Sequence, residues 1–318
     1  MNNNFSFVFP GQGSQFVGMG KELIENKIAK EVFEEVNDTL GFDIQKICFE
    51  GPENILTLTE NTQPAIMTVS IAIFRIFANL LGDNNINKRV KYIAGHSLGE
   101  YSALCINGVL SLKDTAKILY IRGKTMQDAM KGTIGKMAAI LFTNIDEVNE
   151  FITDNNIDNC YIANDNGGGQ VVISGSKDSI DYFLDLSKRT KKFKRIVPLK
   201  VSAAFHSYYM KNAVPVMQEA FNEINFDDIK IPLISNVTAK AETDVKILTD
   251  LLLQQLYSRV RWKESIEYAI KNGGNKFVEI GPSNVLSRLI NKISSDVTAY
   301  NLYHLNDIEN FINDHWIV

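Results

Sequence analysis

The chain has 318 residues, of which 45% are hydrophobic and 22% are charged, proportions that are ordinary for a globular protein. This length is enough to bury a sizeable core in one large domain or two smaller ones. The net charge of -4 argues against a nucleic-acid-binding protein, because such proteins carry basic patches. The three cysteines are odd in number and scattered, which argues against a disulfide framework or a zinc site and favours a reducing compartment.

Neither a targeting segment nor a membrane span is expected from the sequence. The N-terminus lacks a cationic segment before a long apolar run, so no signal peptide is evident. The apolar stretch 64–81 is interrupted by Thr68, Ser70 and Arg75, which predicts a buried helix and not a membrane span. We therefore expect a cytoplasmic protein that binds no membrane and no nucleic acid.

The first predicted strand, at 5–9, is an aromatic and β-branched run that ends in Pro-Gly-Gln-Gly-Ser-Gln at 10–15. This turn has Phe16 where the dinucleotide fingerprint needs its third glycine, and it lacks the Gly-Lys-Ser/Thr of a Walker loop. Two interpretations stay open. The loop lines a site with its backbone amides and the Gln12 side chain, or it is a plain strand-to-helix turn, which the loop taken alone favours.

Two helices are predicted next. The first covers 21–40, and the second is the buried apolar stretch, which follows an Asn-Thr-Gln-Pro turn at 61–64 and has Pro64 in its first turn.

The motif Gly-His-Ser-Leu-Gly-Glu at 95–100 has the pattern of a nucleophile elbow. An apolar run at 90–94 predicts a buried strand before it, and a helical pattern that ends at Gly108 follows it. In Gly-x-Ser-x-Gly, the two glycines allow a sharp turn that exposes the serine hydroxyl at the end of the strand. The N-terminus of the helix adds partial positive charge and free N–H groups where an oxyanion would form. We therefore predict that Ser97 is a nucleophile.

A capping box formed by Ser111 and Asp114 predicts the start of another helix, which runs to about residue 130. On this helix Arg122 shares a partly apolar face with Ile118 and Met126. Such a guanidinium either extends to water, which is the commoner outcome, or is held for a carboxylate or a phosphate.

The pattern changes from Gly135 onward, where strands and helices are predicted in the order β-α-β-β-α-β. The strands are expected at 136–142, 160–163, 170–174 and 194–201, with a polar, glycine-rich loop at 164–169 and helices after 144 and 176. This order is the split βαβ plan of a ferredoxin-like subdomain. We assign 132–201 to this subdomain, inserted into a larger α/β unit made of 1–131 and 202–318.

The larger unit resumes with Ser-Ala-Ala-Phe-His-Ser at 202–207. After it we expect a helix to about residue 222, a strand at 231–235, a helix at 248–257, a strand at 277–280 and a last helix around 285–289. The tripeptide at 236–238 matches a glycosylation acceptor, which means little without a signal peptide.

A serine nucleophile needs a base, and histidine is the usual one. The elbow turn should point the side chain of His96 away from the hydroxyl, and His304 and His315 lie in a polar C-terminal stretch. His206, at a strand-to-loop transition, is therefore the best candidate. No acidic residue is placed convincingly as a third member, so a dyad with the imidazole oriented by a backbone carbonyl stays open beside a triad.

Several motifs together resemble the acyltransferase family. They are Phe-Pro-Gly-Gln-Gly-Ser-Gln at 9–15, Gly-His-Ser-Leu-Gly-Glu at 95–100, Arg-Gly at 122–123, Ala-Phe-His-Ser at 204–207, Gln-Leu-Tyr at 255–257 and Glu-Ile-Gly-Pro at 279–282. The motifs keep the family's order over nearly the whole chain, so they are far more specific than the serine motif alone. The resemblance implies an α/β-hydrolase-like core with an inserted ferredoxin-like subdomain, which agrees with the predicted elements.

The resemblance also implies an activity: transfer of a malonyl group from malonyl-CoA to the phosphopantetheine thiol of acyl carrier protein, in fatty acid biosynthesis. Ser97 would hold the malonyl group as an ester, and His206 would act first as base and then as acid. The backbone amides of Gln12 and Leu98 would form the oxyanion hole. No cofactor and no metal are implied, and we expect a monomer.

The remaining residues implied by the resemblance bind substrate. Arg122 would pair with the free malonyl carboxylate, and the backbone carbonyl near Gln255 would orient the catalytic histidine. Phe205 would hinder an α-methyl branch, a partial filter because such a clash is worth only ~1–3 kcal/mol. Gln63 and Asn166 would complete the substrate site.

Three alternatives stay open. A serine thioesterase or esterase would share Ser97 and His206 but leaves Arg122 and the Gln12 loop unexplained. In a non-catalytic carrier-binding subunit the serine would be only a turn residue. A stand-alone acyltransferase of a polyketide synthase would look the same in sequence.

Overall fold

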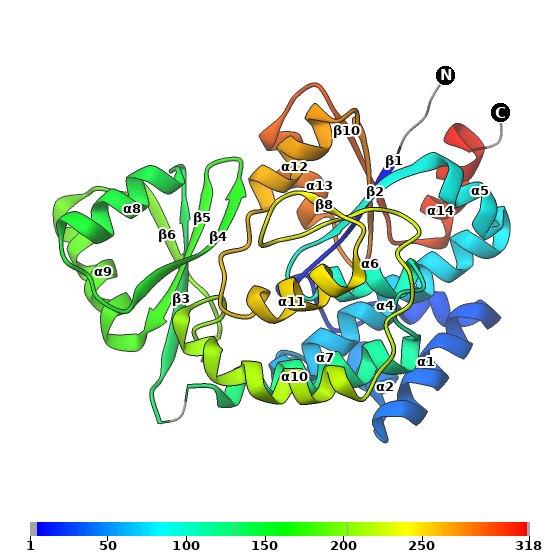
Figure 1. Ribbon diagram of the computed structural model, residues 1–318, viewed down its shortest axis with the longest axis horizontal. Helices are drawn as coiled ribbons and strands as arrows, with labels where there is room; N and C mark the ends of the chain where they lie inside the picture. Colours follow the sequence, from blue (N-terminus) through cyan, green and yellow to red (C-terminus); the bar gives the residue numbers. More distant parts are fainter. Residues whose placement is uncertain (1–4, 131, 202, 317–318) are drawn as a thin grey trace.

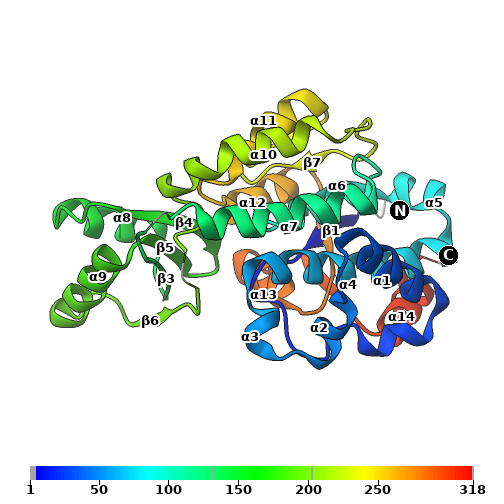
Figure 2. The same ribbon diagram turned by 90° about the horizontal axis from the view of Figure 1, so that it is seen from below.

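A computed structural model describes residues 5–130, 132–201 and 203–316. The chain is a mixed α/β protein with one six-stranded and one four-stranded sheet, which confirms the predicted class. The smaller sheet and its two helices project to one side of the larger unit in both views (Figures 1 and 2). The predicted boundaries at residues 131 and 202 lie outside the described residues.

The larger sheet combines strands from both ends of the chain. Its neighbouring strands pair in parallel except for the last pair, which is antiparallel. In spatial order the strands are β10 (Thr298–Leu302), β9 (Lys276–Ile280), β1 (Phe5–Phe9), β2 (Val90–Gly95), β7 (Leu233–Ile234) and β8 (Ala241–Glu242).

The central strand β1 is buried on both faces. Phe7 packs on one face against Phe74 and Phe77 of helix α4 (Thr59–Leu81), with ring centroids 6.4 and 5.8 Å away. Val8 points to the opposite face, where it joins the apolar residues of helices α12 (Trp262–Lys271) and α13 (Val285–Ile293). This alternation follows from the two-residue period of a strand, and it places helices on both sides of the sheet.

Helix α4 begins at Thr59, so the predicted turn at 61–64 and the first-turn position of Pro64 are wrong. The polar residues of that stretch anchor the helix to the preceding segment: Asn61 Nδ2 donates to Ile55 O at 2.9 Å, and Thr62 Oγ1 donates to Leu56 O at 2.6 Å. Among the described helices only α4 is long and apolar enough to cross a membrane, and 72% of its most apolar window is buried inside the protein. The predicted buried helix is therefore confirmed.

The other helical segments of the larger unit surround this core. The predicted helix at 21–40 is interrupted at Asn26, whose side chain caps the second part by accepting from Ile28 N at 2.9 Å. The segments are η1 (Lys21–Glu25), α1 (Lys27–Leu40), α2 (Ile44–Glu50), α3 (Glu53–Leu56), α5 (Asp83–Arg89), α6 (Gly99–Ile106), α7 (Leu112–Asp128), η2 (Tyr208–Ala213), α10 (Val214–Asn222), α11 (Val245–Gln255) and α14 (Leu305–His315).

The prediction that the last helix lies around 285–289 is wrong, because β10 and α14 follow α13. β10 was missed because it is an edge strand that is only partly buried, and its sequence Thr-Ala-Tyr-Asn-Leu has little apolar patterning.

The smaller sheet is antiparallel, in the order β4-β5-β3-β6. Its strands are β3 (Gly135–Leu141), β4 (Cys160–Gly167), β5 (Gln170–Ser176) and β6 (Arg195–Pro198), and its helices are α8 (Ile145–Asp154) and α9 (Lys177–Thr190). The predicted order of elements is confirmed, but 164–167 belongs to β4 and not to a loop. The main chain of β4 bonds to the larger unit: Asp165 N donates to Val260 O at 3.0 Å, and Val260 N donates to Ala163 O at 2.8 Å.

Helix α7, which extends toward the smaller sheet in Figure 2, touches the start of α4 at Gly123. A Cβ atom at this position would lie 2.5 Å from Thr59 O, and backbone cannot move aside as a flexible side chain can. We expect Gly123→Ala to lower the free energy of unfolding by about 1–2 kcal/mol, although alanine favours a helix. Urea unfolding measures this change. The exposed neighbour Lys124 is the control, since Lys124→Ala should cost less than about 0.5 kcal/mol, and equal effects would contradict the prediction.

Candidate active site

Ser97 lies between β2 and α6, so the predicted strand-turn-helix is confirmed. Its φ of 53° is in the left-handed region, which a serine rarely adopts. The turn is tight because a Cβ at Gly95 would lie 1.9 Å from the carbonyl carbon of Gly99, and a Cβ at Gly99 would lie 2.2 Å from Phe9 O. The two glycines are therefore required by the close approach of β1, β2 and α6.

The side chain of Asn236, which follows β7, stabilises this strained turn through two hydrogen bonds to its backbone. Its Oδ1 accepts from Ser97 N at 2.8 Å, and its Nδ2 donates to Gly95 O at 2.7 Å. Sequence reasoning missed this role. No local signal marks it, because the contact joins residues 139 positions apart.

Ser97 and His206 form a dyad. The Oγ of Ser97 lies 2.8 Å from His206 Nε2, and His206 Nδ1 lies 2.9 Å from Gln255 O and 3.2 Å from Ser258 O. Carbonyl oxygens only accept hydrogen bonds, so Nδ1 carries the proton and Nε2 is free to accept from the serine hydroxyl. Within the described chain no carboxylate contacts this imidazole, which decides for the dyad over the triad.

The pKa of His206 is lowered to about 3, first by burial and then by the positive charge of Arg122. The imidazole is therefore neutral at neutral pH, which is the state that a general base needs. The neighbouring His96 forms its hydrogen bond elsewhere, because its Nε2 lies 2.9 Å from Asn166 Oδ1.

Arg122 is only 1% exposed, so the interpretation in which it extends to water is wrong. Its Nη1 donates to Gln63 Oε1 at 2.8 Å, and its Nη2 donates to Gln255 Oε1 at 2.7 Å and to Ser97 Oγ at 3.0 Å. In the described part of the chain, no Asp or Glu forms an ion pair with this guanidinium within 4 Å. A buried cation beside the Ser97 hydroxyl thus lacks a direct counterion among the described residues.

A cavity surrounds the Ser97 hydroxyl. Gln12 and Leu98 line it, so the interpretation of the Gln12 loop as a plain turn is wrong. The backbone N–H groups of these two residues donate to no other described residue, and they are available to an oxyanion. Phe205, 7% exposed, and Gln63 also line the cavity.

Two predicted substrate-binding residues are not on the cavity wall. Asn166 bonds to His96 and donates to Gln170 Oε1 at 2.9 Å, while Asn164 of the same strand lines the cavity. Gln255 instead contacts Arg122 and His206. Among the residues that the structure describes, no cluster of His, Cys, Asp and Glu could hold a metal ion.

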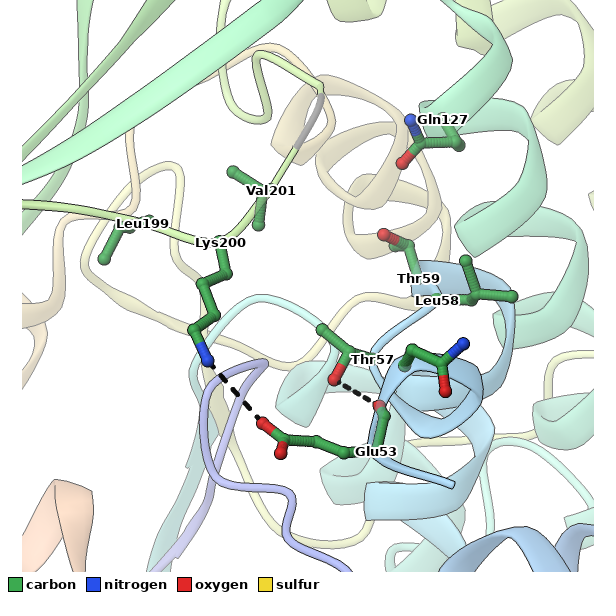
Figure 3. Close-up of a pocket in the computed structure, with 9 residues that line it drawn as sticks. Glu53, Thr57, Leu58, Thr59, Gln127, Leu199, Lys200 and Val201 are labelled. Atoms are coloured by element: carbon green, nitrogen blue, oxygen red, sulfur yellow. Dashed lines mark hydrogen bonds and ion pairs between the residues drawn. The ribbon is translucent and has the colours of Figure 1, made fainter. Parts of the chain in front are cut away.

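A wider groove, which Figure 3 shows, adjoins this cavity. Leu199 and Val201 line both the groove and the cavity. Its opposite wall is formed by the segment from Glu53 to Thr59, at α3 and the start of α4. Figure 3 shows Lys200 extending across the groove to Glu53, an ion pair of 3.7 Å between two exposed side chains.

Known proteins match this chain over nearly its whole length, and a family model described as acyl transferase domain covers residues 6–304. A malonyl CoA-acyl carrier protein transacylase of Bacillus subtilis (strain 168) is 41% identical over 296 residues, 92% of this chain and 91% of that protein. Its namesake in Staphylococcus aureus (strain MRSA252) is 39% identical over 307 residues, 96% of this chain and 97% of that protein.

Solved structures agree with these matches. The crystal structure of an acyl-carrier-protein-S-malonyltransferase from Bartonella henselae has a TM-score of 0.93 and 44% identity, and the match covers 98% of this chain and 99% of that chain. A malonyl-transacylase solved in complex with its type II PKS acyl-carrier protein has a TM-score of 0.92 and 32% identity, over 98% of this chain and 100% of that chain.

The low pKa of His206 predicts how the reactivity of Ser97 depends on pH. The base works in its neutral form, which is lost as the pH falls through the pKa of the folded protein. The rate at which a fluorophosphonate probe labels Ser97 should therefore stay level when the pH is lowered from about 8 to about 5. Arg122→Gln removes the charge that lowers this pKa, so labelling of the variant should decline at a higher pH than in the wild type.

Labelling is measured by mass spectrometry, with Ser97→Ala as the unlabelled control and circular dichroism at each pH to verify folding. If labelling of Arg122→Gln declined at the same pH as labelling of the wild type, or at a lower pH, the result would contradict the assigned effect of the Arg122 charge on the pKa of His206.

Proposed function

Because this chain belongs to the acyl transferase domain family, as its motifs predicted, we propose that it transfers a malonyl group from malonyl-CoA to the phosphopantetheine thiol of acyl carrier protein, in fatty acid biosynthesis. The observation that carries this proposal is the buried guanidinium of Arg122, 3.0 Å from the Ser97 hydroxyl and without a direct counterion among the described residues. A short acyl group with a carboxylate at its far end supplies this missing counterion, because a carboxylate and a guanidinium form a bidentate pair.

The first half of the reaction loads Ser97. Its Oγ attacks the thioester carbonyl carbon of malonyl-CoA while His206 Nε2 takes the hydroxyl proton. The backbone N–H groups of Gln12 and Leu98 stabilise the oxyanion of the tetrahedral intermediate. The carbon–sulfur bond then breaks, and the CoA thiolate leaves with the proton from His206. Ser97 is left as a malonyl ester.

The second half runs the same steps in reverse with the carrier thiol. His206 Nε2 takes the thiol proton, and the thiolate attacks the ester carbonyl carbon. When the ester bond breaks, Oγ of Ser97 takes the proton back from His206. Atoms and charge balance without a cofactor.

The Arg122 pair also gives a physical reason for transfer over hydrolysis. It fixes the acyl group in one orientation and helps keep water from a productive approach to the ester. The thioesterase alternative does not account for this arginine. Phe205, on the cavity wall, would crowd an α-methyl branch.

For the architecture, we infer a ferredoxin-like subdomain at 132–201 inserted into an α/β-hydrolase-like core at 1–131 and 202–318. Support comes from the element order β3-α8-β4-β5-α9-β6 together with the antiparallel sheet order β4-β5-β3-β6. The free thiols of Cys48, Cys105 and Cys160 fit a reducing, cytoplasmic location.

We further infer that the groove in Figure 3 admits the pantetheine arm shared by CoA and the carrier. The thioester must reach Ser97 from outside, and this groove adjoins the cavity through Leu199 and Val201. Its walls come from the larger unit and from the end of the smaller one.

The acyl-enzyme tests the proposed function. Incubation with malonyl-CoA should add a malonyl group to Ser97, detected by mass spectrometry, and Ser97→Ala should abolish this mass shift without unfolding. Arg122→Ala should lower kcat/KM for malonyl loading by at least about 100-fold and affect acetyl loading much less, because only malonyl pairs with the guanidinium.

Unmodified Ser97 in the wild type would refute the catalytic role. Equal losses for malonyl and acetyl in Arg122→Ala would refute the carboxylate pair. Rapid release of malonate that does not depend on acyl carrier protein would instead identify a hydrolase.

The inferred route through the groove is tested by narrowing it. Leu199→Trp should lower kcat/KM for malonyl-CoA by about 10-fold or more, because the pantetheine arm must pass this wall. The rate with p-nitrophenyl acetate, which has no such arm, should fall several-fold less, although Leu199 also borders the Ser97 cavity. Tyr182→Trp, at an exposed position of α9, is the control. Equal effects of Leu199→Trp on both substrates would place the route elsewhere.

A further inference from the structure

Glu100 is a buried acid that the reaction described above does not use. It lies in the first turn of α6, three residues after the nucleophile, and is 1% exposed. Its Oε1 accepts from Asn236 N at 2.6 Å, and its Oε2 accepts a short hydrogen bond from Gln255 Nε2. Both oxygens face donors, which is the arrangement of an ionised carboxylate.

Gln255 connects three parts of the active site. Its main-chain oxygen orients His206, its Oε1 accepts from Arg122 Nη2 at 2.7 Å, and its Nε2 donates to Ser97 O at 2.9 Å. The side-chain amide is thus placed directly between a guanidinium and the carboxylate of Glu100.

Arg122 and Glu100 together determine the orientation of the Gln255 amide. A guanidinium can only donate, so it requires the amide oxygen, and a carboxylate can only accept, so it requires the amide nitrogen. If the Gln255 amide were turned by 180°, its NH2 would face the guanidinium of Arg122, so two donors would meet. Its oxygen would face the carboxylate of Glu100, so two acceptors would meet. Burial raises the pKa of Glu100 to about 8, and the two donors and the charge of Arg122 act against that rise.

We propose that Glu100 is a positioning residue for malonyl transfer: it holds the Gln255 amide in the orientation that presents an acceptor to Arg122. The guanidinium is thereby fixed where the malonyl carboxylate must bind, with its Nη2 turned toward Ser97 Oγ. The inference rests on the proposed function, because it concerns the placement of the malonyl-binding arginine.

Glu100→Gln tests this role, since it keeps the shape and removes one acceptor. The introduced amide can accept from Asn236 N with its oxygen only if its NH2 faces Gln255. The Gln255 amide must then turn, and its own NH2 meets the guanidinium of Arg122. We expect kcat/KM for malonyl loading to fall by roughly 10- to 100-fold, the effect of one lost hydrogen bond to a charged group, and acetyl loading to fall by less than about 3-fold.

Both rates are measured by mass spectrometry of Ser97 at about pH 8.5, above the pKa of Glu100. Glu279→Gln is the matched control, because Glu279 is also buried and accepts from two backbone N–H groups, those of Leu286 at 3.1 Å and Ser287 at 2.7 Å. It should lower the free energy of unfolding and leave the malonyl-to-acetyl ratio unchanged. An unchanged ratio in folded Glu100→Gln would overturn the proposal.

A second variant keeps the test decisive if Glu100→Gln folds poorly. Gln255→Leu retains the main-chain carbonyl that orients His206 and removes the amide through which Glu100 acts. It should reduce the malonyl-to-acetyl ratio to a similar extent, and the double variant should be no worse than either single one. A wild-type ratio in Gln255→Leu, or additive effects, would overturn the proposal. Absence of malonyl-Ser97 in the wild type would instead refute the proposed function itself.

Discussion

The burial of the Arg122 guanidinium next to the nucleophile constrains how the surrounding elements are arranged. A cation removed from water is stable only when polar partners replace its hydration. Those partners come from three separate elements: Gln63 from α4, Ser97 from the elbow and Gln255 from the end of α11. Helix α4 and the elbow are in turn buried against the central strand β1. The core packing therefore also places the charge, which in the proposed function pairs with the malonyl carboxylate.

The smaller sheet contributes to the same geometry through β4. Asn166 of that strand bonds to His96, the residue before the nucleophile. Two further hydrogen bonds join Ala163 and Asp165 to Val260, which is two residues beyond Ser258, a backbone partner of His206. One strand thus contacts the segments that flank Ser97 and the backbone partner of His206, and catalysis depends on distances in a site being held within a fraction of an ångström. Of these contacts, only that of Asn166 uses a side chain of β4, since the bonds to Val260 join main chains.

What could be predicted from the sequence was local. The elbow at Ser97 follows from the spacing of two glycines between a strand and a helix, and the resemblance to the acyltransferase family supplied Arg122 and the Gln12 loop. The helix face of Arg122 did not reveal its burial, because the covering Gln63 comes from another helix. Asn236 and Glu100 were missed for the same reason. Asn236 even matched a glycosylation acceptor, and it is fully buried. Contacts between distant segments leave no periodic pattern in the chain.

The neighbouring charges link substrate recognition to the strength of the base. Burial and, after it, the charge of Arg122 lower the pKa of His206, so the imidazole is a weak base when no acyl group is bound. A malonyl carboxylate paired with the guanidinium offsets that charge, and this part of the pKa shift is then removed. The imidazole becomes more basic when a dicarboxylic acyl group is in place, at the step where it must take a proton from Ser97 or from the carrier thiol. An acetyl group brings no charge, so it binds without strengthening the base. With Arg122 in its proposed role, selectivity for malonyl would therefore arise in the chemical steps as well as in binding.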